Sequence, residues 1–345
     1  MIWLTWRQFR TQALATLVLL AAAAVCFLIT GIQIHHTYSA DLAACTPVHD
    51  CSDVLSHFAH SYNAEFNLAQ LLVIAAPALI GIFWGAPLVG RELETGTDQL
   101  AWTRSVTRTR WLAVKLIGIG IAAIATAAVL SFLLTWWAGP LDHINGNRFE
   151  GITFSSRDIV PLAYAAFAFT LGTTAGLLLR RTVPAMAVTL AVFVGIQILV
   201  PAVIRPNLLR STTVTFPVNK TTASRATGVY TSGGGSEIYF AGLPIPPGAW
   251  VLSAPPIEDS SGQAVAASAH LRCFPQAAGP GPSKAGGIDA EQTADCLAAY
   301  NLHESITYQP ARYYWPLQWY ETGIFLALAG ALSGTSFWWI RRRRS

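Results

Sequence analysis

Six apolar runs, each long enough to form a membrane-crossing helix, constrain this chain more than any other feature. A helix needs about 20 residues to cross a hydrocarbon layer of about 30 Å. The runs contain no two-residue alternation, which favours helices over a membrane barrel, whose strands alternate lipid-facing and lumen-facing residues. They are Ala13–Ile34, Leu68–Val89, Trp111–Trp137, Ile159–Leu179, Val183–Ile204 and Trp319–Ile340. The chain is therefore predicted to be an all-α polytopic membrane protein with six transmembrane helices.

The composition of the 345 residues agrees with this prediction. Hydrophobic residues make up 53% of the chain and charged residues only 12%. A soluble domain of this length carries about twice that share of charged residues. A soluble globular protein is thereby excluded.

Basic residues next to the apolar runs predict how the helices are oriented. They are Arg7 and Arg10 before the first run, Arg180 and Arg181 after the fourth, and Arg341–Arg344 after the sixth. Short loops that carry Lys and Arg remain in the cytoplasm. Both termini are therefore predicted to be cytoplasmic (N-in/C-in), and the connections after the first, third and fifth runs are predicted to face outward.

The connection between the second and third runs is the most highly charged stretch next to the membrane. We call residues 90–111 the coupling loop; it reads GRELETGTDQLAWTRSVTRTRW. Thr97 can cap a short helix that presents Leu100 and Trp102 as an apolar surface ringed by charges, which is typical of docking hot spots. The alternative is a solvated loop whose arginines anchor lipid phosphates. Because the acidic residues have no lipid-anchoring role, the pattern favours docking of a soluble partner.

The long segment between the fifth and sixth runs, residues 205–318, is predicted to be an extracytoplasmic mixed α/β domain. Long loops are translocated largely regardless of their charge. Strand-like pieces occur at Thr213–Val218, Glu237–Phe240 and Trp250–Ser253, between turn-rich stretches, and a short helix is expected from Asp289. The chain is thus divided into residues 1–204, residues 205–318 and residues 319–345.

Cysteine placement fits this topology. Cys45 and Cys51 lie in the first outer connection, and Cys273 and Cys296 lie in the long outer segment, whereas Cys26 lies inside a run. Disulfides persist outside the cytoplasm. The two outer pairs are therefore disulfide candidates, with unpaired thiols as the alternative.

Both ends of the chain carry features of a membrane interface. Tyr313, Tyr314, Trp315 and Trp319 lie at the start of the last run and predict an outer aromatic belt, with substrate stacking as the alternative. The first twelve residues, MIWLTWRQFRTQ, suit a short helix lying in the inner interface. A plain positively charged flank would explain this segment as well.

Catalytic and nucleotide-binding motifs are absent from the sequence. It contains no GxxxxGK[ST] phosphate loop, no HExxH, no CxxC and no GxSxG. The chain is therefore predicted not to be an enzyme and to hold no cofactor of its own.

Metal binding and ion coupling are also poorly supported. His49, His57 and His60 cluster in the first outer connection without a compact ligand spacing, so a solvated, disulfide-closed loop is favoured and no metal site is predicted. Glu65 and Glu321 lie at the outer ends of spans that otherwise contain almost no ionisable residues. Ion-coupled carriers hold their ion with buried acids or histidines.

Two stretches carry a family resemblance. The segment GRELETGTDQLAWTRSVTRTRWLAVKL and the segment YQPARYYWPLQWYETGIFL before the last run resemble the ABC-2 type permease subunits of high-GC Gram-positive bacteria, and the likeness extends over essentially the whole chain. It implies that two permease subunits form a pathway and that separate ATPase subunits, which bind ATP and Mg, dock beneath them. The residues it implies for ATPase coupling are Glu92, Glu94, Thr97, Asp98, Leu100 and Trp102.

The sequence and the resemblance together predict the permease half of an ATP-driven exporter in the bacterial cell membrane. Its partners would be an ATPase, a second permease subunit (identical or different) and the lipid bilayer. No nucleic-acid partner is predicted. So apolar a pathway favours a lipid-, peptide- or drug-like amphiphile as cargo. The alternatives are a membrane-anchored sensor or assembly protein that uses the outer domain, and an ion-coupled secondary transporter.

Overall fold

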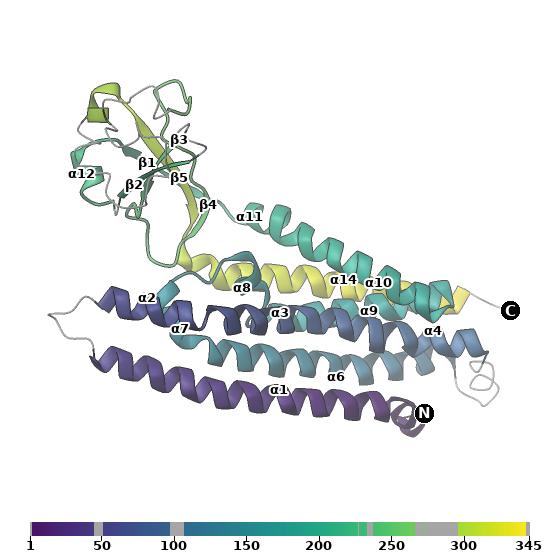
Figure 1. Ribbon diagram of the computed structural model, residues 1–345. Helices are drawn as coiled ribbons and strands as arrows, with labels where there is room; N and C mark the ends of the chain where they lie inside the picture. Colours follow the sequence, from purple (N-terminus) through teal and green to yellow (C-terminus); the bar gives the residue numbers. More distant parts are fainter. Residues whose placement is uncertain are drawn as a thin grey trace. The chain divides into compact units, whose positions relative to one another are not determined.

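The structure, a computed structural model, divides into two compact units (Figure 1). The first comprises Met1–Leu208 and Tyr314–Ser345, and the second comprises Leu209–Tyr313. The residues that the structure describes are 2–44, 51–96, 107–226, 228–232, 237–265, 273 and 296–342.

The first unit is a helical bundle. Its elements are α1 (Ile2–Ala44), α2 (Cys51–Ser61), α3 (Asn63–Ile80), the π-helical turn η1 (Gly81–Gly85), α4 (Ala86–Thr95), α6 (Arg108–Trp137), α7 (Gly139–Asn145), α8 (Gly151–Ser155), α9 (Val160–Leu179), α10 (Thr182–Leu199), the π-helical turn η2 (Val200–Ile204), α11 (Arg205–Asn207) and α14 (Tyr314–Arg342). Six helical segments among the described residues are long and apolar enough to cross a membrane. The prediction of six helices of membrane-crossing length is confirmed, and the helices extend beyond most of the predicted runs.

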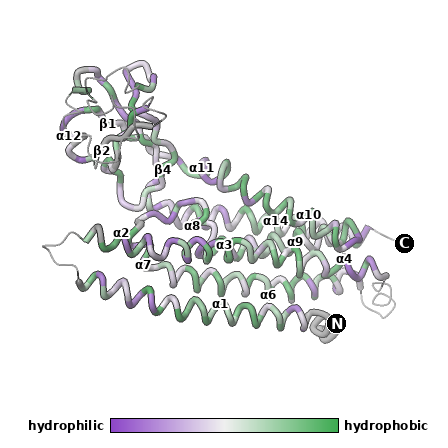
Figure 2. Tube along the Cα trace, viewed as in Figure 1, coloured by the Kyte–Doolittle hydropathy of each residue, from purple (hydrophilic) through white to green (hydrophobic). Residues whose placement is uncertain are grey.

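Figure 2 shows hydrophobic residues along the long helices and a hydrophilic end at α4. The start of α1 and the end of α14 lie at the same end of the bundle as the end of α4 (Figure 1). An even number of spans requires the two termini to share a side. Which side that is remains a prediction from the basic flanks.

Helix α9 occupies the centre of the bundle. Most residues of α9 are buried, whereas α1 buries few of the side chains described, among them Phe27 and Ile34, because it packs mainly against α6 at the edge. Small residues allow η1 and α4 to approach α9 closely: a Cβ added to Gly172 would lie 2.2 Å from the carbonyl oxygen of Gly81. Such backbone contact is a recurring way of packing membrane helices.

The N-terminal stretch does not form a separate interfacial helix. Helix α1 runs without interruption from Ile2 to Ala44 and therefore includes the residues expected to lie in the interface. The boundaries of the second unit also lie a few residues inside the predicted range 205–318. The helix of the fifth span continues through η2 and α11, and α14 begins at Tyr314.

The second unit contains strands and short helical turns around its own apolar core. Its elements are β1 (Thr212–Pro217), α12 (Lys220–Ala223), β2 (Gly228–Ser232), β3 (Glu237–Ala241), β4 (Trp250–Ser253), the 3-10 turn η4 (Ala298–Tyr300), β5 (His303–Gln309) and the 3-10 turn η5 (Ala311–Tyr313). β1 and β4 flank β5 in an antiparallel sheet, and β2 pairs with β3. The core includes Ile238, Ile257, Leu297 and Ile306.

Three predicted strands correspond to β1, β3 and β4, whereas β2 and β5 were not predicted. β5 was missed because a polar pattern, HESITYQ, occupies the central strand. The helix expected from Asp289 lies outside the described residues. That the unit faces outward remains a prediction.

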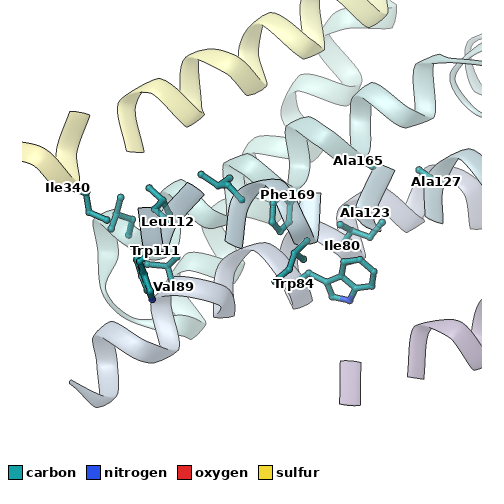
Figure 3. Close-up of a cluster of buried hydrophobic side chains, with 13 residues drawn as sticks. Ile80, Trp84, Val89, Trp111, Leu112, Ala123, Ala127, Ala165, Phe169 and Ile340 are labelled. Carbon is teal, nitrogen blue, oxygen red and sulfur yellow. The ribbon is translucent and has the colours of Figure 1, made fainter. Parts of the chain in front are cut away.

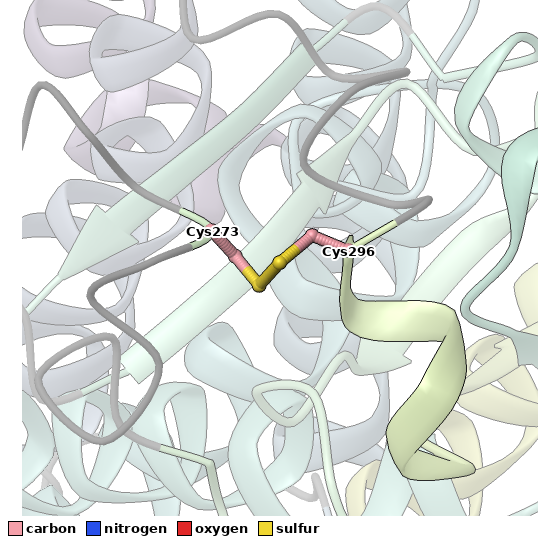
Figure 4. Close-up of a disulfide and its surroundings, with 2 residues drawn as sticks. All are labelled: Cys273 and Cys296. Carbon is pink, nitrogen blue, oxygen red and sulfur yellow. A yellow bond between two sulfur atoms is a disulfide. The ribbon is translucent and has the colours of Figure 1, made fainter.

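A disulfide joins Cys273 to Cys296, with Cα atoms 5.4 Å apart (Figure 4). Cys273 belongs to the apolar core of the second unit, and Cys296 packs against it. The bond therefore closes a loop onto that core. Cys45 lies outside the described residues, so its pairing with Cys51 remains a prediction.

Candidate functional site

The coupling loop as predicted, residues 90–111, includes the end of α4 and the start of α6, because both helices extend beyond the apolar runs. Helix α4 ends at Thr95, and Gly96 follows in the left-handed region (φ 69°) with its N–H bonded to the carbonyl oxygen of Glu92. At the other end, the side chain of Thr107 caps α6 by accepting a hydrogen bond from the backbone N–H of Arg110 (3.4 Å). Residues 97–106 lie outside the described residues, and with them Thr97, Asp98, Leu100 and Trp102.

A buried ion pair joins α4 to α6, the two helices that the coupling loop connects. Nζ of Lys115 on α6 lies 2.6 Å from Oε1 of Glu92 on α4, with 3% of the lysine side chain and 16% of the glutamate side chain exposed. The ammonium also donates to the carbonyl oxygen of Leu88 (3.3 Å) and lies over the ring of Trp111. A buried ammonium is tolerated only when it is paired in this way. The pair therefore holds the end of α4 against α6.

An apolar cluster includes Trp111, the ring beneath Lys115, and connects α3, η1, α4, α6, α9 and α14 (Figure 3). Val89 comes from α4, Trp111 and Leu112 from α6, Phe169 from α9 and Ile340 from α14. All five side chains are buried. Because protein interiors are close-packed, a displacement at the end of α4 is transmitted to these neighbours.

Glu94 makes a second connection, to the start of α10. Its Oε2 accepts hydrogen bonds from the backbone N–H of Thr182 (3.0 Å) and from the hydroxyl of the same residue (2.8 Å). A carboxylate at a helix N-terminus is stabilised by the unpaired N–H groups there. Glu92 and Glu94, both predicted to contact a partner protein, thus have partners within this chain.

A second polar cluster lies among α8, α9, α11 and α14, and sequence reasoning missed it. Arg205 forms two hydrogen bonds with Glu321, from Nε to Oε2 (2.8 Å) and from Nη2 to Oε1 (2.9 Å). Its Nη2 also donates to the hydroxyl of Ser155 (2.7 Å), and the hydroxyl of Tyr164 donates to Oε1 of Glu321. Arg205, Glu321 and Tyr164 have no exposed surface.

Neighbouring polar side chains extend this cluster. Asp142 on α7 pairs with Arg157 and with Arg148, and the hydroxyl of Tyr314 donates to Asp158. Of the groups involved, the sequence singles out Glu321, as an acid at the outer end of a span, and Tyr314, as part of an aromatic belt. The sequence places Arg205 in the outer domain because it follows the fifth apolar run directly, whereas in the structure it belongs to the helical bundle.

A model of the family described as "ABC-2 membrane transporter related" matches residues 17–205, which is more than half of the chain. The chain belongs to this family. The matched range of this ABC-2 family member includes most of the first and fifth spans, the second, third and fourth spans, the coupling loop and Arg205. No curated protein and no solved structure matches the chain.

The predicted aromatic belt of this ABC-2 family member is only partly at the surface. Trp315 and Trp319 are 53% and 63% exposed, as lipid-facing residues would be. Tyr314 is buried, because it lies on the face of α14 that carries Leu317 and packs into the bundle. Tyr314 is therefore not a belt residue. Tyr313 is half-buried in the second unit.

The histidines of the first outer connection were weighed as metal ligands. The described residues contain no group of three or more His, Cys, Asp or Glu side chains that could hold a metal ion. His57 lies on α2 with His60, whereas His49 lies outside the described residues.

Proposed function

We propose that this ABC-2 family member is the permease half of an ATP-driven exporter whose ATPase is a separate polypeptide that docks on the coupling loop. One observation carries the proposal: both ends of the loop are fixed to the membrane bundle. Glu92 fixes α4 to α6 through Lys115, and Glu94 fixes α4 to α10 through Thr182. A loop anchored in this way transfers a displacement of its tip to three spans.

The ATPase would bind ATP and Mg, and this chain would supply the movable pathway. Of the six predicted coupling residues, Thr97, Asp98, Leu100 and Trp102 are left for docking, since Glu92 and Glu94 are engaged within the bundle. Two permease subunits would form the pathway in the bacterial cell membrane, with both termini and the coupling loop in the cytoplasm. The second unit, Leu209–Tyr313, would then face outward.

The cargo proposed is a lipid-, peptide- or drug-like amphiphile. Large apolar side chains are exposed along α3 and α10, among them Leu68, Leu71, Val183 and Ile198. The buried charges described above pair with one another within the bundle, so they do not offer an open site for a free ion.

Co-purification tests the proposal. The chain is expressed with the stand-alone ATPase that we expect an adjacent reading frame to encode, and the complex is isolated through a tag on the permease. Trp102→Ala should abolish co-purification of the ATPase, because an aromatic anchor is removed from the docking surface. Trp319→Ala, a substitution of an exposed tryptophan on α14, is the matched control and should leave co-purification of the ATPase unchanged. Equal recovery of the ATPase with both variants would contradict docking at this loop.

One observation favours a second candidate, an ion-coupled carrier. Glu321, Arg205 and Tyr164 form a buried hydrogen-bonded cluster in the bundle, and buried acids within membrane spans mark proton relays in some transporters. A carrier of this kind would move its cargo when a proton gradient is imposed on vesicles that contain the chain alone. Glu321→Gln would abolish that movement.

A further inference from the structure

The connection between α9 and α10 places the start of α10 beside the end of α4. Helix α9 ends at Leu179, and Arg180 follows in the left-handed region (φ 55°) with its N–H bonded to the carbonyl oxygen of Gly176. α10 then begins at Thr182. A Cβ added to Gly90 on α4 would lie 3.6 Å from Cα of Thr182, so the two backbones are in close contact.

Helix α10 receives its cap from α4 and not from its own sequence. Arg181, its N-cap residue, makes no side-chain capping hydrogen bond to the described residues. The first N–H groups of a helix have no acceptor within the helix. Glu94 supplies one, through its bonds from the backbone and hydroxyl groups of Thr182.

Helix α10 packs along one face against α9, α4 and η1, where Ala185, Thr189 and Phe193 are buried, and its other faces are exposed. The contact at Thr182 lies at the start of this packed face and is its polar connection to the end of α4. The Lys115–Glu92 pair differs from the Glu94–Thr182 contact in two respects: it joins α4 to α6 and not to α10, and its ammonium is buried.

We propose that Glu94 is a positioning residue that makes the cytoplasmic end of the fifth span follow the coupling loop. It lies one position before Thr95, the last residue of α4, and it is the last carboxylate of that helix. Movement of the loop displaces this carboxylate, and α10, capped by it, is displaced as well. Because Glu94 is exposed, its bonds to Thr182 can break and re-form in contact with water. The inference rests on the proposed function for the source of the movement.

The contact itself is tested on the full chain without any partner, by hydrogen exchange. In Glu94→Ala the peptide covering residues 182–190 should exchange about five-fold faster, as loss of a helix cap implies. Arg91→Ala, at an exposed neighbouring position on α4, should not change this rate. Equal exchange in Glu94→Ala and wild type would overturn the proposal at this first step.

The transmission of movement is tested with two spin labels in the permease–ATPase complex, in a Cys26→Ser background. Val183→Cys reports on α10, where Val183 is 75% exposed, and Thr95→Cys reports on the end of α4. Addition of a non-hydrolysable ATP analogue with Mg should change the mobility of both labels. With Glu94→Ala, the response at position 95 should persist and the response at position 183 should be lost. Thr182→Val, which keeps the backbone N–H but not the hydroxyl, should give an intermediate response.

Each remaining outcome is decisive. A response at position 183 that survives Glu94→Ala would overturn the positioning role. Loss of the ATPase from Glu94→Ala with unchanged exchange at α10 would do the same, because Glu94 would then serve the partner. Failure of any ATPase to bind the wild-type chain, or of either label to respond, would overturn the proposed function and with it this inference.

Discussion

Arg205 and Glu321 lie 116 positions apart in the sequence, yet Nε of Arg205 is 2.8 Å from Oε2 of Glu321 and neither side chain reaches the surface. The pair connects the end of the fifth span to the start of the sixth. The guanidinium also lies over the ring of Phe154, 4.2 Å from its centroid. The ends of three helices, α8, α11 and α14, are therefore held together by charge as well as by packing.

Removal of one partner from this pair should destabilise the bundle strongly. Glu321→Leu leaves a buried guanidinium without its carboxylate, and such a loss costs about 3–5 kcal/mol. Thermal unfolding of the full chain in detergent measures the effect. The double variant Arg205→Met with Glu321→Leu should recover much of the loss, because no charge then remains unpaired. A double variant no more stable than Glu321→Leu would show that the pairing of charges is not the reason.

Gly172 should not tolerate a methyl group. A Cβ there would lie 2.2 Å from the carbonyl oxygen of Gly81, and backbone atoms cannot rotate away. Gly172→Ala should force α9 and η1 apart and lower the stability by about 1–3 kcal/mol. Gly195→Ala, where a Cβ would meet no described atom within 4 Å, is the control. Equal melting temperatures for the two variants would disprove the close approach.

The second unit should lose stability as the pH rises towards neutrality. Burial raises the pKa of Glu304 from 4.5 to about 7, even though the hydrogen bond from the backbone N–H of Phe240 lowers it. Between these two values the folded chain retains a proton that the unfolded chain has released. Stability is therefore greatest below pH 4.5 and falls up to about pH 7, by an amount on the order of 2 kcal/mol.

The measurement compares the wild type with Glu304→Gln, which still offers an oxygen to Phe240 but cannot ionise. The melting temperatures of both full-length proteins are measured at pH 5 and at pH 8, and the difference between the two proteins is taken at each pH. The contributions of all other titrating groups cancel in this difference. The advantage of Glu304→Gln should be larger at pH 8. A difference that is the same at both pH values would rule out ionisation of Glu304 as the cause.

Reduction of the disulfide should loosen the second unit. The bond closes a loop with a sequence separation of 23 residues, which corresponds to about 3 kcal/mol in the chain-entropy model. Cys273→Ser with Cys296→Ser should increase the rate at which a protease cleaves residues 209–313 in the full chain. Cys26→Ser, a change at the exposed free cysteine of α1, should leave that rate unchanged. Unaltered cleavage of the double serine variant would contradict a stabilising role for the bond.

The spans were predictable because hydropathy over about 20 residues is a direct property of the local sequence. The predicted run Ile159–Leu179 differs from α9 by one residue at its start. Strands β1, β3 and β4 were also readable from β-branched and aromatic runs. β5 was not, since Glu304, Ser305 and Gln309 make it polar although two of these side chains are buried.

The partners of individual charges could not be predicted. Glu92 and Glu94 look alike in sequence, but their positions on α4 direct one towards Lys115 and the other towards Thr182. Such pairings depend on how helices distant in sequence pack. Tyr314 was assigned to the surface for the same reason: composition identifies an aromatic belt, whereas the face of α14 that packs inward is set by the neighbouring helices.

The central claim is that a separate ATPase drives this permease through the coupling loop. The most direct measurement is accumulation of a fluorescent amphiphile by sealed vesicles that contain the purified chain, with and without the co-purified ATPase, ATP and Mg. The account predicts accumulation against a gradient only when ATPase, ATP and Mg are all present, and its loss with Trp102→Ala. Accumulation by the chain alone, driven by a proton or sodium gradient, would contradict it.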